Sequence, residues 1–422
     1  MSGLRPRSNF SLPRPLVVLL IVIALPPALA ACGASGPPPS GLHTGPAYAF
    51  HVTPGETFDM TRGRAVPDSE IAERLRGVRL LFLGEQHTNP GSHRFQLAVI
   101  EALRASGRKV GVALEMFPPS ANGALEAWRL GKLEEEAFLE RAGWYTHWGY
   151  PWAHYRELFL AFRRHALPLR GVYAERDTRL KVRQNKLSAL PPGVRAALKG
   201  LGESLRPGQR YLLDALKTGG HAGEMTTDSP AFKRFSRVQE MWERLMGQRA
   251  ARWAESRPSQ AVTVVLIGSG HLAHRLGANL RAARIRPVPQ LTVWDTVVGK
   301  HALDAEGKLR VPLGMAGWVR VYTRQKAPVR YPSLGGLKLK AGEAGAEGLT
   351  VARVGLFASR ELKAIKKGDR IVSLNGKRHQ SAAALRLAYE RLPFGKPARF
   401  LILRNGKRII LEIVPRAENM HQ

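Results

Sequence analysis

The chain has 422 residues, which is enough for two to three domains of ordinary size, and its 44% hydrophobic content is typical of a globular protein. Its formal net charge of +32 is explained either by an acidic partner, which would be nucleic acid, an anionic membrane surface or an acidic small molecule, or by solvated basic surface alone. Its single cysteine, Cys32, excludes a disulfide within the chain.

The first residues predict a cleaved export signal. Three arginines precede an apolar run at residues 16–25, and the tetrad Leu29-Ala30-Ala31-Cys32 follows. The run is shorter than the roughly 20 residues that a membrane-spanning helix needs. The tetrad resembles the lipobox of bacterial lipoproteins, which implies that residues 1–31 are removed and that Cys32 carries lipid. Export argues against nucleic acid as the partner and leaves an anionic membrane surface or an acidic small molecule.

Residues 32–49 are expected to form a lipidated, flexible tether. The stretch GASGPPPSGLHTGP after Cys32 has no charged residue and little to bury. Gly33 stands where an aspartate commonly marks retention in the inner membrane. We therefore expect a lipid-anchored protein of the cell envelope, at the outer membrane and facing the periplasm.

Residues 50–328 alternate apolar runs with amphipathic segments. This pattern predicts an α/β domain with a mostly parallel sheet flanked by helices. A polar-faced helical subdomain is expected as an insert at about residues 180–252. The expected elements, in chain order, are a strand at 78–83, a helix at 92–105, strands at 110–114 and 168–172, the insert, and strands at 262–267 and 291–294.

Residues 331–416 predict a small β-rich domain. Two apolar strands flank Asn405-Gly406, a strong signal for a hairpin. Residues 367–376 resemble the GDxIxxxNG core of a PDZ domain, although Ser359-Arg360-Glu361 departs from the Ser-Pro-Ala of many bacterial examples. Leu334-Gly335-Gly336-Leu337 resembles the loop that binds a peptide carboxylate. The resemblance implies a peptide groove beside a helix at 382–392, which would dock an envelope protein or peptide.

Polar residues follow several of the predicted strands. Glu85 and His87 come after the first strand, Glu115 after the second, and His271, with His274 beyond it, after the fourth. Ligands of open α/β sheets bind outside the carboxyl ends of the strands. Carboxylate and imidazole together can bind a divalent metal, act as an acid/base pair or hydrogen-bond an anionic ligand. A buried polar network that holds the loops is the structural alternative.

An aromatic segment at residues 144–155 predicts a surface for a flat apolar partner. Pro151 breaks helical periodicity there, so residues 144–150 are expected in a loop. The alternative is a helix-packing core. The aromatic and histidine residues are Trp144, Tyr145, His147, Trp148, Tyr150, Trp152, His154 and Tyr155.

The helical insert carries a third set of polar and basic residues. Its basic side chains are expected either to pair with carboxylates of a ligand or lipid headgroups, or to be simply exposed. The set is Gly220, His221, Lys233, Arg234, Gln239 and Trp242.

Residues 78–275 resemble the ChaN-like haem-binding lipoproteins. The matching stretches are Leu83–His87, Leu114–Phe117, Trp148–Tyr155, Phe235–Met246 and Gly268–His271. The resemblance implies haem bound at a dimer interface, and therefore a ligand-induced homodimer. It also implies a tyrosine on the iron and a histidine and a lysine on the propionates. Phenolate suits ferric haem as a hard anionic ligand.

The iron ligand is expected to be Tyr155, then Tyr150, then Tyr173. For the propionates we expect His221 or His271, together with Lys233. The C-terminal PDZ-like domain is a departure from the simple plan of this family.

Two other functions remain open at this point. The paired GxxH motifs also resemble the wider Tiki and erythromycin-esterase-like superfamily. That resemblance implies a metal-dependent hydrolase that uses Glu85, His87, Glu115 and His271 on a divalent metal or on water. The other possibility is that the PDZ-like domain is the working part and the α/β domain its scaffold.

Overall fold

The computed structural model describes residues 48–202, 226, 229–324, 331–341, 347–355 and 358–415. The predicted export signal, Cys32, most of the tether and His221 lie outside these ranges. Within them, no helix has the length and apolar character needed to cross a membrane.

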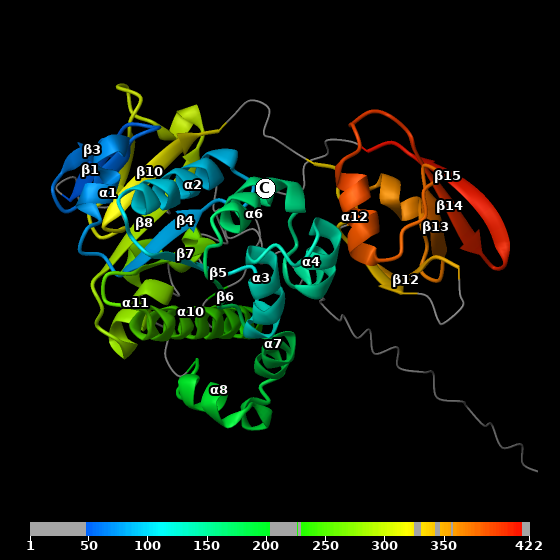
Figure 1. Cartoon of the computed structure of the whole chain (residues 1–422), viewed down its shortest axis with the longest axis horizontal. Helices are drawn as coiled ribbons and strands as arrows, with labels where there is room; N and C mark the ends of the chain where they lie inside the picture. The colour runs from blue at the N-terminus through cyan, green and yellow to red at the C-terminus, as the bar shows by residue number, and fades with distance from the viewer. Residues whose placement is uncertain are drawn as a thin grey trace, which may run out of the picture.

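An eight-stranded sheet forms the centre of the larger domain (Figure 1). Its order is β3-β2-β10-β8-β4-β7-β5-β6, with parallel pairing from β10 to β6 and antiparallel pairing of β2 and β3 at one edge. The strands are β2 (Thr57–Asp59), β3 (Arg64–Val66), β4 (Leu80–Glu85), β5 (Val110–Leu114), β6 (Leu169–Gly171), β7 (Val262–Gly268), β8 (Gln290–Val298) and β10 (Trp318–Thr323). An α/β domain is therefore confirmed, with a sheet that is mixed rather than wholly parallel. A separate antiparallel pair joins β1 (Ala49–Val52) to β9 (Leu309–Pro312).

Both faces of this sheet are buried, which explains the continuous apolar runs of its strands. Successive side chains of a strand point to opposite faces. Leu81 and Leu83 accordingly belong to one core, while Leu80 and Phe82 belong to another.

Helices cover each face of the sheet. The first core receives α2 (Pro90–Ala105), α3 (Asn122–Arg129), α4 (Glu135–Arg141), α5 (Trp144–His147) and α6 (Arg156–Arg164). The second receives α7 (Arg176–Arg183), α8 (Pro192–Ala197), α10 (Pro230–Ser256) and α11 (Ala278–Ile285). A short α1 (Ile71–Arg74) precedes β4.

The long helix α10 lies against the sheet rather than in a separate insert. Ser229 caps its first turn by accepting a hydrogen bond from the Phe232 N–H, and Pro230 occupies the first helical position, which suits proline. A Cβ at Gly247 would lie 2.2 Å from the Ala278 carbonyl oxygen, so glycine there permits close packing on α11. Of the region expected as a helical subdomain, α10 is thus part of the main domain.

The C-terminal part is a five-stranded antiparallel sheet with one α-helix, α12 (Ala382–Glu390). Its strands follow chain order as β11 (Leu337–Ala341), β12 (Leu349–Val354), β13 (Arg370–Leu374), β14 (Ala398–Arg404) and β15 (Lys407–Ile413). The predicted hairpin is confirmed. Asn405 and Gly406 between β14 and β15 both have positive φ, 50° and 77°, as a type I′ turn requires.

The two parts of the chain pack together through α12. Figure 1 shows this helix facing α4 of the larger domain, and α12 also contacts the 3-10 turn η5 (Trp152–His154). Ala383 and Leu387 of α12 are buried in the first core of the α/β domain.

Candidate functional site

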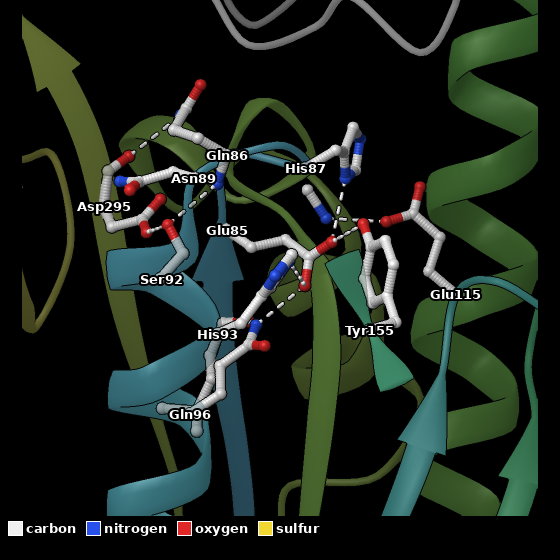
Figure 2. A network of polar contacts seen from close by, with 12 residues as sticks. Glu85, Gln86, His87, Asn89, Ser92, His93, Gln96, Glu115, Tyr155 and Asp295 are labelled. Carbon is white, nitrogen blue, oxygen red and sulfur yellow. Dashed lines mark hydrogen bonds and ion pairs between the residues drawn. The ribbon is translucent and has the colours of Figure 1, made fainter. Parts of the chain in front are cut away.

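Glu85 at the end of β4 is the centre of a buried polar network (Figure 2). Its Oε1 accepts a hydrogen bond from the Tyr155 hydroxyl at 2.6 Å and lies 2.9 Å from His87 Nδ1. Its Oε2 accepts a hydrogen bond from Gln96 Nε2 at 2.9 Å and lies 3.8 Å from His93 Nε2. Burial alone would raise the pKa of Glu85, but the hydrogen bond of His87 and the nearby imidazole charges hold it well below its ordinary value. Glu85 is therefore a carboxylate at neutral pH.

Glu115 and His271 form the neighbouring part of the site. Glu115 follows β5, and its Oε2 accepts a hydrogen bond from the Gly268 N–H at 2.6 Å. Its Oε1 lies 3.5 Å from His271 Nε2, while Glu243 of α10 lies 3.6 Å from His271 Nδ1. Burial lowers the pKa of His271, but the two carboxylates outweigh it, and the net pKa is raised. The pair of carboxylates thus favours an imidazolium at this position.

Gly268 joins the two halves of the site. A Cβ there would lie 2.8 Å from His87 Cε1, so glycine leaves room for the His87 ring, while 3.6 Å from Glu115 Oε2 is an ordinary contact distance. Because β7 lies between β4 and β5, its carboxyl end lies beside the ends of both strands. The structure thus brings Glu85, His87, Glu115 and His271 together at one edge of the sheet.

Sequence reasoning missed the part of the network that lies around Asp295. Ser92 and Ser269 donate hydrogen bonds to the two carboxylate oxygens of Asp295, at 2.5 and 2.7 Å. Asp295 lies in β8, one residue beyond the predicted end of that strand, so the strand-end argument applied to β8 would have found it. Ser92, His93 and Gln96 are polar residues on the buried side of α2, which is a second signal.

Burial raises the pKa of Asp295 to about 7, from an ordinary value of 3.8. A carboxyl with a raised pKa stabilises the fold at low pH, and this contribution is lost as the pH rises from about 4 to 7. We expect the parent to lose free energy of unfolding between pH 4.5 and pH 7.5. Asp295→Asn should lose about 2 kcal/mol less over the same range. Urea unfolding across pH 4–8 measures the difference, with the exposed Asp177→Asn as the control. An unchanged slope in Asp295→Asn would contradict the assignment.

The aromatic segment, residues 144–155, is core rather than surface, so the expected open surface for a flat partner is not present. Residues 144–147 form α5 after Gly143, whose φ of 67° starts the turn, and do not lie in a loop. The rings pack edge-to-face or tilted against one another and against Phe159 of α6. The buried members are Trp144, Trp148, Tyr150, Trp152 and Tyr155.

The three candidate tyrosines differ in their surroundings. Tyr155, the first expectation for the iron ligand, is 0% exposed and donates its hydroxyl to Glu85. Its hydroxyl is therefore not accessible to a ligand in this conformation. Tyr150 is 8% exposed, and its ring centroid lies 4.8 Å from that of His87. Tyr173 stacks on Trp242 at 5.5 Å, on the other face of the sheet.

The basic residues expected for the propionates differ in their exposure to solvent. Lys233 and Arg234 are exposed in the first turns of α10. His271, in contrast, is buried between two carboxylates. His274 adopts a positive φ of 54° just beyond it.

Nothing in the described ranges places three histidine, cysteine, aspartate or glutamate side chains so that they could hold a metal ion. The geometry therefore gives no support to the divalent-metal alternative.

The loop expected to bind a peptide carboxylate precedes β11. Leu334 and Leu337 are buried, and the Gly335 N–H donates to Ser333 Oγ at 3.0 Å. Arg386 of α12 donates to the carbonyl oxygens of Leu334 and Leu337, at 3.0 and 2.5 Å. The Arg386 side chain thus spans from α12 to this loop.

One family model matches this chain. A model of the family described as "Haem-binding uptake, Tiki superfamily, ChaN" matches residues 71–281. The haem-binding ChaN of Campylobacter jejuni is similar in structure, with 15% identity and a TM-score of 0.48 over 64% of this chain and 96% of that one. The erythromycin esterase EreC shows 12% identity and a TM-score of 0.33 over 61% and 82% of the two chains.

The HtrA-type protease AlgW, solved with a decapeptide, shows 18% identity and a TM-score of 0.18 over 20% of this chain and 29% of that one. No curated protein matches the sequence.

Proposed function

The chain belongs to the haem-binding uptake family of the Tiki superfamily, ChaN, whose model covers half of its residues, and we propose that it binds haem in iron uptake through a tyrosine ligand. One observation carries the proposal. The matched residues 71–281 contain Glu85, Glu115 and His271 of the polar network and the aromatic segment packed against it.

We propose Tyr150 as the iron ligand. Its ring centroid lies 4.8 Å from that of His87 and the residue keeps 8% exposure, whereas Tyr155 is 0% exposed. Bound ferric haem supplies an iron whose charge favours the phenolate. The phenol must lose its proton to bind there. For a propionate, the exposed Lys233 is a better partner than His271, which two carboxylates already surround.

Haem titration of residues 47–422 tests this proposal. We expect the wild type to develop the visible bands of a tyrosinate–ferric complex and Tyr150→Phe to lose them, with affinity weakened about tenfold or more. Tyr155→Phe serves as the matched control and should keep the bands. Loss of the bands in Tyr155→Phe alone would return the role to that residue, and a wild type without haem bands would refute haem binding. Mass measured with and without haem tests the proposed ligand-induced homodimer.

The setting of this function is also a proposal. A lipid on Cys32 would anchor the protein in the cell envelope, at the outer membrane and facing the periplasm, and several acyl chains together anchor firmly. The PDZ-like C-terminal domain would dock an envelope protein by its carboxyl end. The support is the placement of Leu334–Leu337 before the edge strand β11, with α12 beside it.

A hydrolase remains the second candidate, because one contact favours it. His87 Nδ1 is held by the Glu85 carboxylate at 2.9 Å, the arrangement that orients an imidazole as a general base. A hydrolase of this kind would lose turnover in His87→Ala and keep it in Tyr150→Phe. A haem-binding protein should keep its haem affinity in His87→Ala and lose it in Tyr150→Phe.

A further inference from the structure

We propose that α12 of the C-terminal domain controls access to the ligand site by holding the aromatic segment closed, with Glu390 and Arg386 as the positioning residues. This inference rests on the proposed haem function for its consequence, but not for its structural basis.

The first support is a set of polar contacts at both ends of α12. Glu140 Oε2 of α4 accepts a hydrogen bond from the Ala383 N–H at the start of α12, at 3.3 Å. At the other end, Glu390 Oε2 accepts one from the Ala153 N–H at 3.3 Å. Glu390 is a buried carboxyl, and leaving such a group without its partner costs free energy. The position of α12 is therefore tied directly to the backbone of the aromatic segment.

The second support is the side-chain packing of α12. Ala383 and Leu387 are each 3% exposed and share one core with the aromatic segment. The Arg386 guanidinium lies 5.4 Å from the centroid of the Tyr145 ring, as a cation–π contact. The same guanidinium donates to the Leu334 and Leu337 carbonyls. Arg386 therefore connects the loop expected to bind a peptide carboxylate to the aromatic segment.

The opposite side of the same segment contacts the candidate site. Trp148 and Tyr150 pack their rings on His87, each with centroids 4.8 Å apart. Tyr155 follows Ala153 by two residues and hydrogen-bonds to Glu85. The segment thus lies between α12 on one side and the polar network on the other.

Entry of a flat ligand requires this segment to move. Tyr150 is only 8% exposed and Tyr155 is 0% exposed, so a haem can contact either ring only after the segment has opened. A shift at Ala153 breaks its hydrogen bond with Glu390. Weakening the α12 contacts should therefore speed ligand association instead of slowing it.

Two measurements on residues 47–422 test the inference. The variants are Glu390→Ala and the milder Arg391→Ala, which removes the ion pair with Glu135 at 3.4 Å from a side chain that is 58% exposed. Glu412→Ala, exposed on β15 of the same domain, is the matched control. Hydrogen exchange without haem reports the opening of residues 144–155, and stopped-flow mixing with haem reports association.

We expect Glu390→Ala to raise exchange at Ala153 about tenfold and haem association several-fold. Arg391→Ala should shift both in the same direction by a smaller factor, and Glu412→Ala should leave both unchanged. The inference is overturned if residues 144–155 exchange in Glu390→Ala and Arg391→Ala at the same rate as in the wild type, or if haem associates more slowly with these variants. If Glu390→Ala fails to fold, Arg391→Ala alone decides. If the wild type binds no haem, the proposed function fails while the exchange data still decide whether α12 holds the segment.

Discussion

Glu85→Ala is expected to lower the free energy of unfolding by about 3–5 kcal/mol, the largest loss of any single change at the site. Removal of the carboxylate leaves the Tyr155 hydroxyl, the Gln96 amide and His87 Nδ1 buried without the acceptor that each contacts. Because the pKa of Glu85 lies below its ordinary value of 4.5, its contribution is present at neutral pH and is lost as the pH falls below about 4.5. Urea unfolding at pH 7 measures the loss.

Two controls separate the network from the loss of one carboxylate. Glu56→Ala removes an exposed glutamate and should change stability by no more than about 0.5 kcal/mol. Glu85→Gln keeps the size and one acceptor oxygen and should cost less than the alanine change. A Glu85→Ala protein as stable as Glu56→Ala would mean that the network contributes nothing to the fold.

Gly84→Ala is expected to cost about 2–4 kcal/mol, although it adds only one methyl group. The new Cβ would lie 2.3 Å from Ser269 Oγ and 3.0 Å from the Val293 carbonyl oxygen. Ser269 would have to rotate away and give up its hydrogen bond with Asp295, while the backbone carbonyl of β8 has little freedom to move. Thermal and urea unfolding measure the cost.

Gly123→Ala is the matched control for this change, because a Cβ at that position in α3 meets nothing within 4 Å. It should leave stability unchanged or raise it by about 0.4–1 kcal/mol. Adding Ser269→Ala to Gly84→Ala should recover part of the loss by removing the closest contact. Equal effects of Gly84→Ala and Gly123→Ala would contradict the close packing of β4 on β8.

The core of the fold was predictable because its strands are buried on both faces. Residues 80–85, 110–114 and 262–268 are mostly apolar and buried at every position, and the predicted strands match them to within two residues at each end. The edge of the sheet could not be predicted in the same way. The strands β2 and β3 are three residues long, too short for any periodicity, and pair antiparallel at the margin.

The site was predictable where a polar residue directly follows a strand. This rule located Glu85, Glu115 and His271, and the strand order explains why Glu115 contacts Gly268 and His271. It could not reveal that Tyr155 is buried, because the side chains that cover it belong to distant parts of the chain. Nor could Pro151 reveal that residues 144–147 are helical, since α5 ends before that proline.

The position of β7 between β4 and β5 also affects the order in which the protein can assemble. The Glu115 carboxylate and the Gly268 N–H, joined by a hydrogen bond, are 153 positions apart in sequence. Until residues 262–268 arrive, β4 and β5 each lack a neighbour and expose an unpaired edge. Contacts over such separations form late and slowly. A chain that has completed only its first 260 residues therefore contains most of the ligand-site side chains but has no way to bring them together.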